Sequence, residues 1–179
     1  MIDKNNIYLI GPMGSGKTVV GRQLAKELSM EFLDSDSEIE TSTGVDIAYI
    51  FEKEGEKSFR NRERECIKLL TQRERIVLAT GGGSIMDEAN RRRLSQNGTI
   101  VYLKTSIESQ LERTQNTKNR PLLMEGSAQE TLVRLAAIRE SEYEAISTFT
   151  VDTGGRQVRA VVITIIKALK NRGFEALKN

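Results

Sequence analysis

The sequence predicts an α/β protein in which helices cover both faces of a parallel sheet. Short apolar segments alternate with helix-like segments along the chain, and this alternation is typical of parallel sheets. A Gly-rich loop connects the first apolar segment to the first helix-like segment. The length of 179 residues favours a single domain that spans residues 1–179.

The individual elements follow from periodicity. Five apolar segments have the length and composition of strands, and they cover residues 7–10, 31–33, 76–79, 100–103 and 149–151. Helices are predicted from residue 17, over residues 107–114 and 158–170, and after a capping box formed by Ser127 and Glu130. Residues 37–72 contain no predicted strand, and their short helices break at Gly44 and Gly55. We therefore expect a substrate-binding region at about 35–65.

The composition excludes several classes of chemistry. The chain contains no His and one Cys, which excludes His-based acid–base catalysis and zinc sites built on His or on several Cys. The formal net charge is +2 with both signs interspersed, so we expect neither a nucleic acid nor a membrane as partner. The N-terminal apolar run is short and no apolar stretch approaches 18 residues, which favours the cytoplasm.

Residues 11–18 read Gly-Pro-Met-Gly-Ser-Gly-Lys-Thr and fit the phosphate-binding pattern G-x-x-x-x-G-K-[ST]. Gly14 and Gly16 allow backbone N–H groups to turn toward the β- and γ-phosphates, and the next helix points its positive end at them. Lys17 is suited to neutralise developing charge, and Thr18 offers a hydroxyl to Mg²⁺. The motif lies between an apolar strand and an amphipathic helix, which is the context that it requires.

A second acidic residue must come from another segment, because the predicted strand at 76–79 ends in glycines without a carboxylate. Asp34 and Asp36 follow the strand at 31–33, and in an extended chain both would point to the same side. One would serve a metal ion and the other an acceptor hydroxyl. The alternative is an N-cap and first-turn acid for a helix beginning near Ser37, and both interpretations can hold together.

Two arginines and a run of glycines are further candidates for ligand binding. Arg139 occupies a position of a helical stripe where an apolar residue is expected, so it either binds a substrate carboxylate or forms an internal salt bridge. Arg60 can pair with Glu63 on one helix face, either in solvent or at a substrate site. The run Gly81-Gly82-Gly83 forms a tight turn or lets a ligand touch the backbone, and we favour the ligand.

Residues 113–124 form a polar run, and Pro121 disfavours helix at Arg120, so we interpret this segment as a mobile lid. The three arginines at 91–93 are expected on a solvated helix face. Cys66 has apolar neighbours and is expected to be a buried core thiol.

These motifs, taken in order, resemble the shikimate kinases of the bacterial type. The match includes residues 11–18, Asp34-Ser35-Asp36, Ile47-Ala48-Tyr49-Ile50-Phe51, Phe59-Arg60 with Glu63, Gly81-Gly82-Gly83, Arg113 with Arg120-Pro121-Leu122-Leu123, and Arg139 with Tyr143. The resemblance implies a three-layer P-loop kinase of the nucleoside monophosphate kinase-like fold, with a five-stranded parallel sheet in the order 2-3-1-4-5. It also implies ATP-dependent phosphorylation of shikimate to shikimate 3-phosphate, a step toward chorismate and aromatic amino acids.

The resemblance further implies roles for individual residues. Catalytic roles are implied for Lys17, Asp36 and Arg120. Contacts with shikimate are implied for Asp36, Arg60, Gly82 and Arg139. Contacts with ATP are implied for Gly14, Ser15, Gly16, Lys17, Thr18, Val19, Arg113, Arg120 and Gln157. One Mg²⁺ per subunit is implied at Thr18 and Asp34, and we expect a monomer.

Two other functions remain as alternatives. A gluconate kinase shares the fold and acts on a different polyol acid, although the Asp-Ser-Asp and Gly-Gly-Gly elements fit shikimate better. A catalytically inert nucleotide-binding regulator would lack part of the acceptor site, whereas this chain has the complete set of Lys, Asp and Arg residues.

Overall fold

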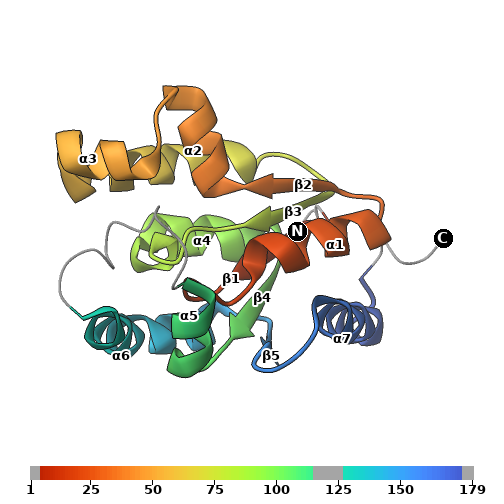
Figure 1. Ribbon diagram of the computed structural model, residues 1–179. Helices are drawn as coiled ribbons and strands as arrows, with labels where there is room; N and C mark the ends of the chain where they lie inside the picture. The colour runs from red at the N-terminus through yellow and green to blue at the C-terminus, as the bar shows by residue number, and fades with distance from the viewer. Residues whose placement is uncertain (1–4, 115–126, 175–179) are drawn as a thin grey trace.

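The computed structural model describes residues 5–114 and 127–174. Five strands form one parallel sheet in the order β2-β3-β1-β4-β5, as the resemblance implies (Figure 1). The strands are β1 (Ile7–Ile10), β2 (Glu31–Asp34), β3 (Ile76–Ala79), β4 (Thr99–Lys104) and β5 (Phe149–Asp152). The helices are α1 (Lys17–Glu27), α2 (Ser35–Thr43), α3 (Ile47–Leu70), α4 (Glu88–Asn97), α5 (Ile107–Thr114), α6 (Ala128–Ile146) and α7 (Val158–Asn171), with a 3-10 turn η1 (Ser84–Met86).

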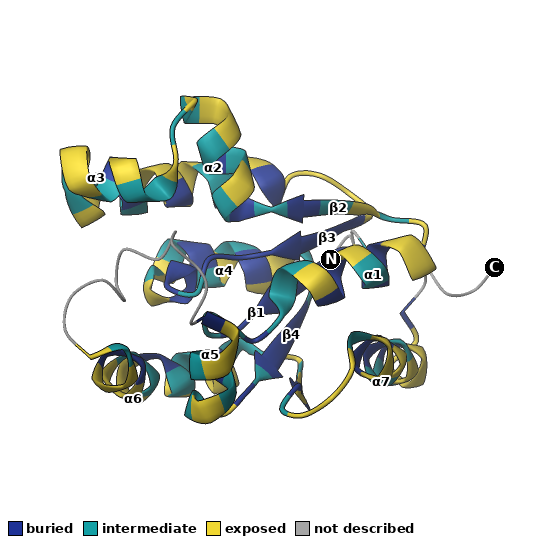
Figure 2. Cartoon of the chain, in the orientation of Figure 1, coloured by how far each residue is buried: buried dark blue, intermediate teal, exposed yellow. Residues whose placement is uncertain are grey.

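The sheet is covered on both faces because successive side chains of a strand point to opposite sides. In β1, Ile7 and Leu9 pack in a cluster with side chains of α1 and α7. Tyr8 and Ile10 pack in a second cluster with side chains of α3, α4 and α6. Figure 2 shows β1 and β3 buried at the centre of the molecule, with exposed positions on the outer sides of the helices. The predicted three-layer architecture is therefore confirmed.

The segment between β2 and β3 is helical, as predicted, and glycines interrupt it. α2 ends at Gly44, where φ is 73°, and α3 is interrupted at Gly55, where φ is 82° and ψ is 167°. Residues with a side chain rarely adopt these angles, so the two glycines determine where the helices break. Ile39, Ile50 and Phe59 form a small apolar cluster of their own within this segment.

Two of the predictions about burial are wrong. Cys66 is half-buried at the edge of two apolar clusters, and its thiol donates to a backbone carbonyl of α2 at 3.6 Å. Among the arginines at 91–93, Arg92 alone is fully exposed. Arg91 donates to carbonyl oxygens of η1 and pairs with Glu142, so it links η1 and α4 to α6. Tertiary contacts therefore bury positions that the helical pattern assigns to solvent.

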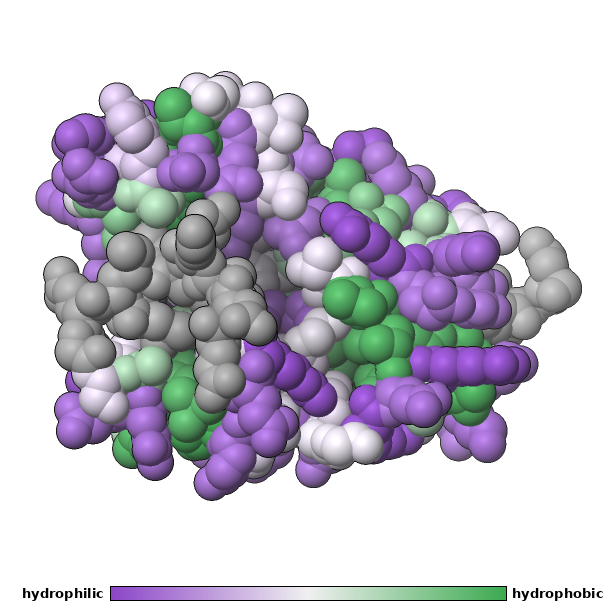
Figure 3. Space-filling view, viewed as in Figure 1, coloured by the Kyte–Doolittle hydropathy of each residue, from purple (hydrophilic) through white to green (hydrophobic). Residues whose placement is uncertain are grey.

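Hydrophilic side chains cover much of the face shown in Figure 3, and apolar side chains form smaller groups between them. Within residues 5–114 and 127–174, no helix combines the length and the apolar character needed to cross a membrane. The strands are parallel, so their carboxyl ends meet at one edge of the sheet. Ligands of open α/β sheets bind at this edge, and the predicted site residues follow β1, β2 and β3 there.

Candidate active site

The loop after β1 has the backbone conformation that its glycines predict. Gly11, Gly14 and Gly16 have φ angles of 144°, 76° and 90°, in the region that favours glycine. Ser15 is fully buried, so its side chain is not available to a ligand. Lys17 begins α1, and its ammonium group donates to carbonyl oxygens of two loop residues at 2.7 and 2.8 Å. The positive charge is therefore held against the loop.

The two oxygens of the Asp34 carboxylate have different partners. Oδ1 accepts the backbone N–H groups of Asp36 at 3.0 Å and Ser37 at 3.3 Å, which caps α2, and Oδ2 accepts the Thr18 hydroxyl at 2.8 Å. The N-cap alternative and the contact with the phosphate loop therefore hold together. The helix already begins at Ser35, so the expected extended geometry of Asp34 and Asp36 is wrong: the cap bends the chain immediately after the strand.

Asp36 lies in the first turn of α2 beside the phosphate loop. Its Oδ1 atom is buried and makes no hydrogen bond with any residue that the structure describes. Burial, reinforced by the charges of Asp34 and Glu63, raises the pKa of Asp36 to about 7, although the charges of Lys17 and Arg60 oppose this rise. A carboxylate with a pKa near neutrality is suited to accept a proton from a substrate hydroxyl.

The glycines that follow β3 lie against side chains of the protein itself. A Cβ atom added at Gly81 would lie 2.7 Å from a carboxylate oxygen of Glu63, and one added at Gly83 would lie 2.5 Å from a guanidinium nitrogen of Arg60. At Gly82 the nearest atoms would lie at 3.5 Å, which is ordinary contact. Glycine at 81 and 83 therefore leaves room for these two side chains, and contact of the glycine run with a ligand stays a prediction. Gly81 and Gly82 both line the cleft, and Gly82 has more free space beside it.

Two arginines and one buried glutamate form the opposite side of the site. Arg60 donates to Glu63 Oε2 at 2.8 Å, and the Glu63 side chain is only 1% exposed. This pair is not the solvated ion pair considered for Arg60. Arg139 is 7% exposed, and it belongs to none of the ion pairs formed among the described residues, so the internal salt bridge considered for it is absent.

Electrostatics favours an anion beside these arginines. Burial raises the pKa of Glu63, and the positive charges of Arg60 and Arg139 both oppose that rise. Two guanidinium groups thus lie near one buried carboxylate, and Glu63 Oε1 has no hydrogen-bond partner among the described residues. Arg60 also pairs with Glu56 at 3.1 Å, so Arg139 is the buried guanidinium without an ion pair among the described residues. A buried charge is costly unless it is paired, so Arg139 is suited to a bound carboxylate.

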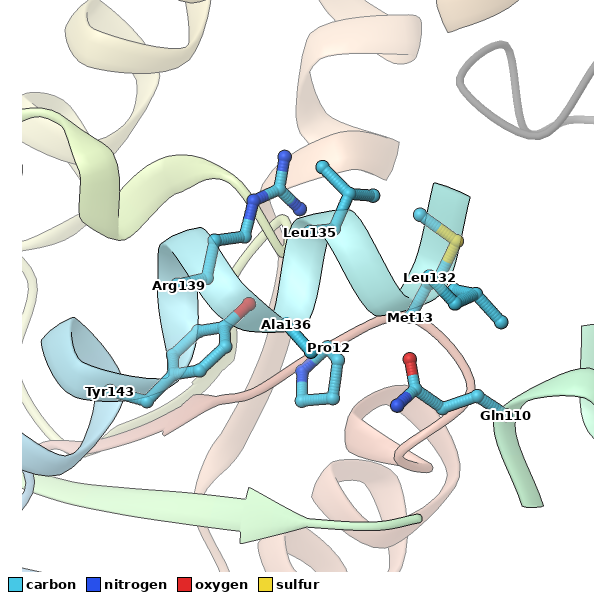
Figure 4. Close-up of a pocket in the computed structure, with 8 residues that line it drawn as sticks. All are labelled: Pro12, Met13, Gln110, Leu132, Leu135, Ala136, Arg139 and Tyr143. Atoms are coloured by element: carbon cyan, nitrogen blue, oxygen red, sulfur yellow. The ribbon is translucent and has the colours of Figure 1, made fainter. Parts of the chain in front are cut away.

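One cleft of about 340 Å³ extends from the phosphate loop to Asp36 and Gly82, two of the residues predicted to bind the acceptor. The predicted site residues that line it are Gly14, Gly16, Lys17, Thr18, Val19, Asp34, Asp36, Gly82 and Arg113. A neighbouring hollow lies between the phosphate loop and α6, where Met13, Leu135 and Arg139 are among the lining side chains (Figure 4). Most of the residues predicted from separate motifs therefore meet at one edge of the sheet.

Arg113 lies in the last turn of α5, at the start of the segment interpreted as a lid. Its guanidinium group donates to the carbonyl oxygens of Gly14 and Thr153, each at 2.9 Å. Thr114 is buried in the same turn, so the first two residues of the predicted lid are helical, and the lid itself stays a prediction. The remainder of that segment, including Arg120, lies outside the described residues.

Gln157 and Thr153 show where the sequence patterns were less informative. Gln157 is exposed at the N-terminus of α7 and is not among the lining residues of the cleft, so its contact with ATP stays a prediction.

Thr153 was not predicted as a site residue. It is 3% exposed, and its hydroxyl donates to the carbonyl oxygen of Ser15 in the phosphate loop at 3.1 Å. The surrounding Asp-Thr-Gly-Gly sequence is typical of an ordinary turn and carries no signal of this contact.

A phosphate loop on a parallel sheet, next to a cleft with a carboxylate of raised pKa and two arginines, defines a P-loop kinase. The family model described as shikimate kinase matches residues 13–170. The chain belongs to the shikimate kinase family.

Individual relatives agree with this assignment. The shikimate kinase of Aliivibrio fischeri is 51% identical over 172 residues, which cover 96% of this chain and all of that protein. A solved structure of shikimate kinase from Acinetobacter baumannii in complex with shikimate is 48% identical with a TM-score of 0.92, covering 94% of each chain. A gluconokinase from Sinorhizobium meliloti is similar at 16% identity with a TM-score of 0.59, over 94% of this chain and 97% of that one, which shows a shared fold alone.

Proposed function

We propose that this protein transfers the γ-phosphoryl group of ATP to a hydroxyl group of shikimate, giving ADP and shikimate 3-phosphate. The observation that carries the proposal is the pair of arginines around the buried Glu63, beside the cleft of the phosphate loop. A carboxylate substrate would pair with the buried guanidinium of Arg139, and shikimate combines a carboxylate with several hydroxyl groups. The whole-length similarity to shikimate kinases supports the same substrate.

In this proposal the phosphate loop binds the nucleotide. Backbone N–H groups of the loop and the positive end of α1 face the phosphates, and Lys17 compensates the charge that develops during transfer. Ser15 contributes through its backbone, because its side chain is buried. In-line transfer of this kind depends mainly on positioning and on charge neutralisation.

Mg²⁺ is assigned to Thr18 and Asp34, whose oxygen atoms are the hard ligands that this cation prefers. When bound, Mg²⁺ would neutralise charge on the β- and γ-phosphates. The described residues hold no cluster of three or more His, Cys, Asp or Glu side chains that could form a cation site alone. A site with few protein ligands fits Mg²⁺, which usually keeps water and phosphate oxygens as ligands. The 2.8 Å contact between the Thr18 hydroxyl and Asp34 supports this assignment.

The acceptor is bound on the other side of the cleft. Arg60 and Arg139 bind the carboxylate, and the planar guanidinium group of Arg139 offers two parallel donors to it. Gly82 contacts the acceptor through its backbone. Asp36 orients the reacting hydroxyl and accepts its proton, for which a pKa of about 7 is suitable.

Some assignments rest on the family resemblance alone. Arg120 is proposed to stabilise the phosphates from the lid segment, and Val19 and Gln157 are proposed to contact the nucleotide. A monomer and a cytoplasmic location are also proposed, and the free thiol of Cys66 is compatible with a reducing compartment.

The test is a coupled assay of ADP formation with purified protein, ATP and Mg²⁺, in which shikimate, gluconate or no acceptor is added. We expect ADP formation that depends on shikimate, with little turnover in the other two reactions. Turnover with gluconate alone would favour the alternative kinase, and no turnover with any acceptor would favour the inert regulator. Lys17→Ala serves as a control for ADP produced by contaminating kinases.

A further inference from the structure

Tyr143 connects α6 to the glycine turn after β3. Its side chain is 2% exposed, and its ring stacks on Tyr102 of β4, with ring centroids 5.0 Å apart and planes tilted by 22°. The Tyr143 hydroxyl donates to the carbonyl oxygen of Gly82 at 2.5 Å. Figure 4 shows Tyr143 and Arg139 side by side on α6. The hydroxyl thus contacts the backbone of Gly82, which is proposed to bind the acceptor. Tyr143 also lies one helical turn after Arg139, the second residue proposed to bind it.

The hydroxyl remains a donor at neutral pH. Burial raises the pKa of Tyr143 well above its usual value, although the positive charge of Arg139 opposes the rise. The group is therefore protonated under working conditions. It contributes one hydrogen to the Gly82 carbonyl while its oxygen faces the guanidinium of Arg139.

This hydrogen bond determines how the glycine turn presents its backbone. A peptide unit is planar and trans, so holding the Gly82 carbonyl on the core side directs the N–H of Gly83 the opposite way. The Gly82 and Gly83 N–H groups donate to no other described residue, whereas the Gly81 N–H donates to Ser35 at 3.0 Å. A glycine turn has no side chains of its own to hold it in one conformation. Backbone N–H groups of η1 donate to the carbonyl oxygens of Gly81 and Gly83, and Tyr143 holds the Gly82 carbonyl between them from the core.

We propose that Tyr143 is a positioning residue of the acceptor site, whose hydroxyl holds the Gly82 carbonyl and faces Arg139, so that both are preorganised for the acceptor. Tyr143 itself does not touch the substrate. The inference rests on the proposed function, because it assigns Gly82 and Arg139 to acceptor binding. It predicts that loss of this single hydroxyl weakens acceptor binding and leaves nucleotide binding unchanged.

The experiment compares Tyr143→Phe with Tyr102→Phe. Each variant removes one hydroxyl from the same stacked pair, but the Tyr102 hydroxyl makes no hydrogen bond with any residue in the described ranges. We expect the KM for shikimate to rise about 5- to 15-fold in Tyr143→Phe, as the loss of one buried hydrogen bond implies. The KM for ATP should stay within twofold of the parent value, and Tyr102→Phe should resemble the parent in both constants.

The split between the two KM values separates positioning from general destabilisation. Partial unfolding would lower kcat through the active fraction and leave both KM values unchanged, so thermal unfolding of each variant is measured alongside. Replacing Tyr143 by 4-aminophenylalanine retains a donor at the same place on the ring and should restore most of the affinity for shikimate. An unchanged KM for shikimate in Tyr143→Phe, or an equal rise in Tyr102→Phe, would overturn the inference. If the parent protein shows no shikimate-dependent turnover, the proposed function itself is overturned.

Discussion

The phosphate loop and the acceptor site differ in how their residues are brought together. Residues 11–18 of the phosphate loop are contiguous between β1 and α1, and Arg113 and Thr153 add hydrogen bonds to two of its carbonyl oxygens. The acceptor side combines Asp36 of α2, Arg60 and Glu63 of α3, the glycine turn after β3, and Arg139 of α6. The first site is thus defined by local backbone geometry, whereas the second depends on the packing of three helices against one sheet.

This difference predicts how the two regions respond to substitution. A change in the phosphate loop should reduce turnover while leaving acceptor binding intact. A change on the acceptor side should alter shikimate binding, and at Glu63 or Arg139 it should alter stability too, because these two side chains are buried. The following predictions test this comparison, and the largest expected effect comes first.

Lys17→Ala should reduce kcat by about 10³-fold, because it removes the charge that stabilises the transferring phosphoryl group. Binding of shikimate, measured by calorimetry without nucleotide, should be unchanged if the two regions are independent. Lys26→Ala is the matched control, since Lys26 is an exposed lysine in the last turn of the same helix. Near-normal turnover in a folded Lys17→Ala variant would contradict the assignment of the phosphate loop.

Asp36→Asn should lower kcat by about 10²-fold while the KM for shikimate changes little, because the amide keeps the size of the side chain but cannot accept the proton. Glu38→Gln, two residues further along α2, provides a control for loss of negative charge. In the parent protein, kcat/KM for shikimate should fall as the pH decreases below about 7, where Asp36 becomes protonated. A flat profile between pH 6 and about 8 would argue against Asp36 as the base.

Arg139→Lys should weaken shikimate binding by about 1–3 kcal/mol, because an ammonium group keeps the charge but loses the planar pair of donors. The affinity for ATP should barely change. Arg134→Lys is the control, as Arg134 is exposed on the same helix. Titration calorimetry measures both ligands directly, and parent-like binding of shikimate by Arg139→Lys would remove Arg139 from the carboxylate site.

Asp36→Asn should also stabilise the fold at neutral pH, by about 1–2 kcal/mol in the free energy of unfolding. The folded-state pKa of Asp36 is about 7 against an ordinary value of 3.8, so the folded protein binds the proton more tightly than the unfolded chain. Deprotonation of Asp36 therefore costs the parent stability as the pH rises from about 4 to about 7, and the variant lacks this contribution. Denaturant unfolding without nucleotide or metal should show a larger difference at pH 8 than at about pH 4. An equal difference at both pH values would contradict the raised pKa.

Thr153→Val should raise the KM for ATP by about 3- to 10-fold, since it removes the hydroxyl that donates to the Ser15 carbonyl behind the phosphate loop. The KM for shikimate should stay constant. Thr105→Val is the matched control, because the Thr105 hydroxyl is buried without a hydrogen-bond partner among the described residues. If both variants change the KM for ATP equally, the effect belongs to general packing and not to support of the loop.

Much of the fold could be predicted from local patterns, and the exceptions have identifiable causes. The five strands and the breaks at Gly44 and Gly55 follow from apolar periodicity and from glycine conformation. The assumed extended geometry after β2 was wrong because Asp34 caps α2 at once. The polar pattern at Arg113 did not indicate that this side chain ends α5 and donates to backbone carbonyls of two distant loops.

The sequence by itself determined the phosphate loop, the alternation of strands and helices, and the residue types available for chemistry. These features depend on neighbours along the chain, where the spacing of apolar residues and the freedom of glycine act directly. Only the tertiary structure decided that Gly81 and Gly83 make room for the carboxylate of Glu63 and the guanidinium of Arg60, and that burial raises the pKa of Asp36 to about 7. Desolvation and charge interactions at these positions come from residues far apart in sequence, so no local pattern carries them.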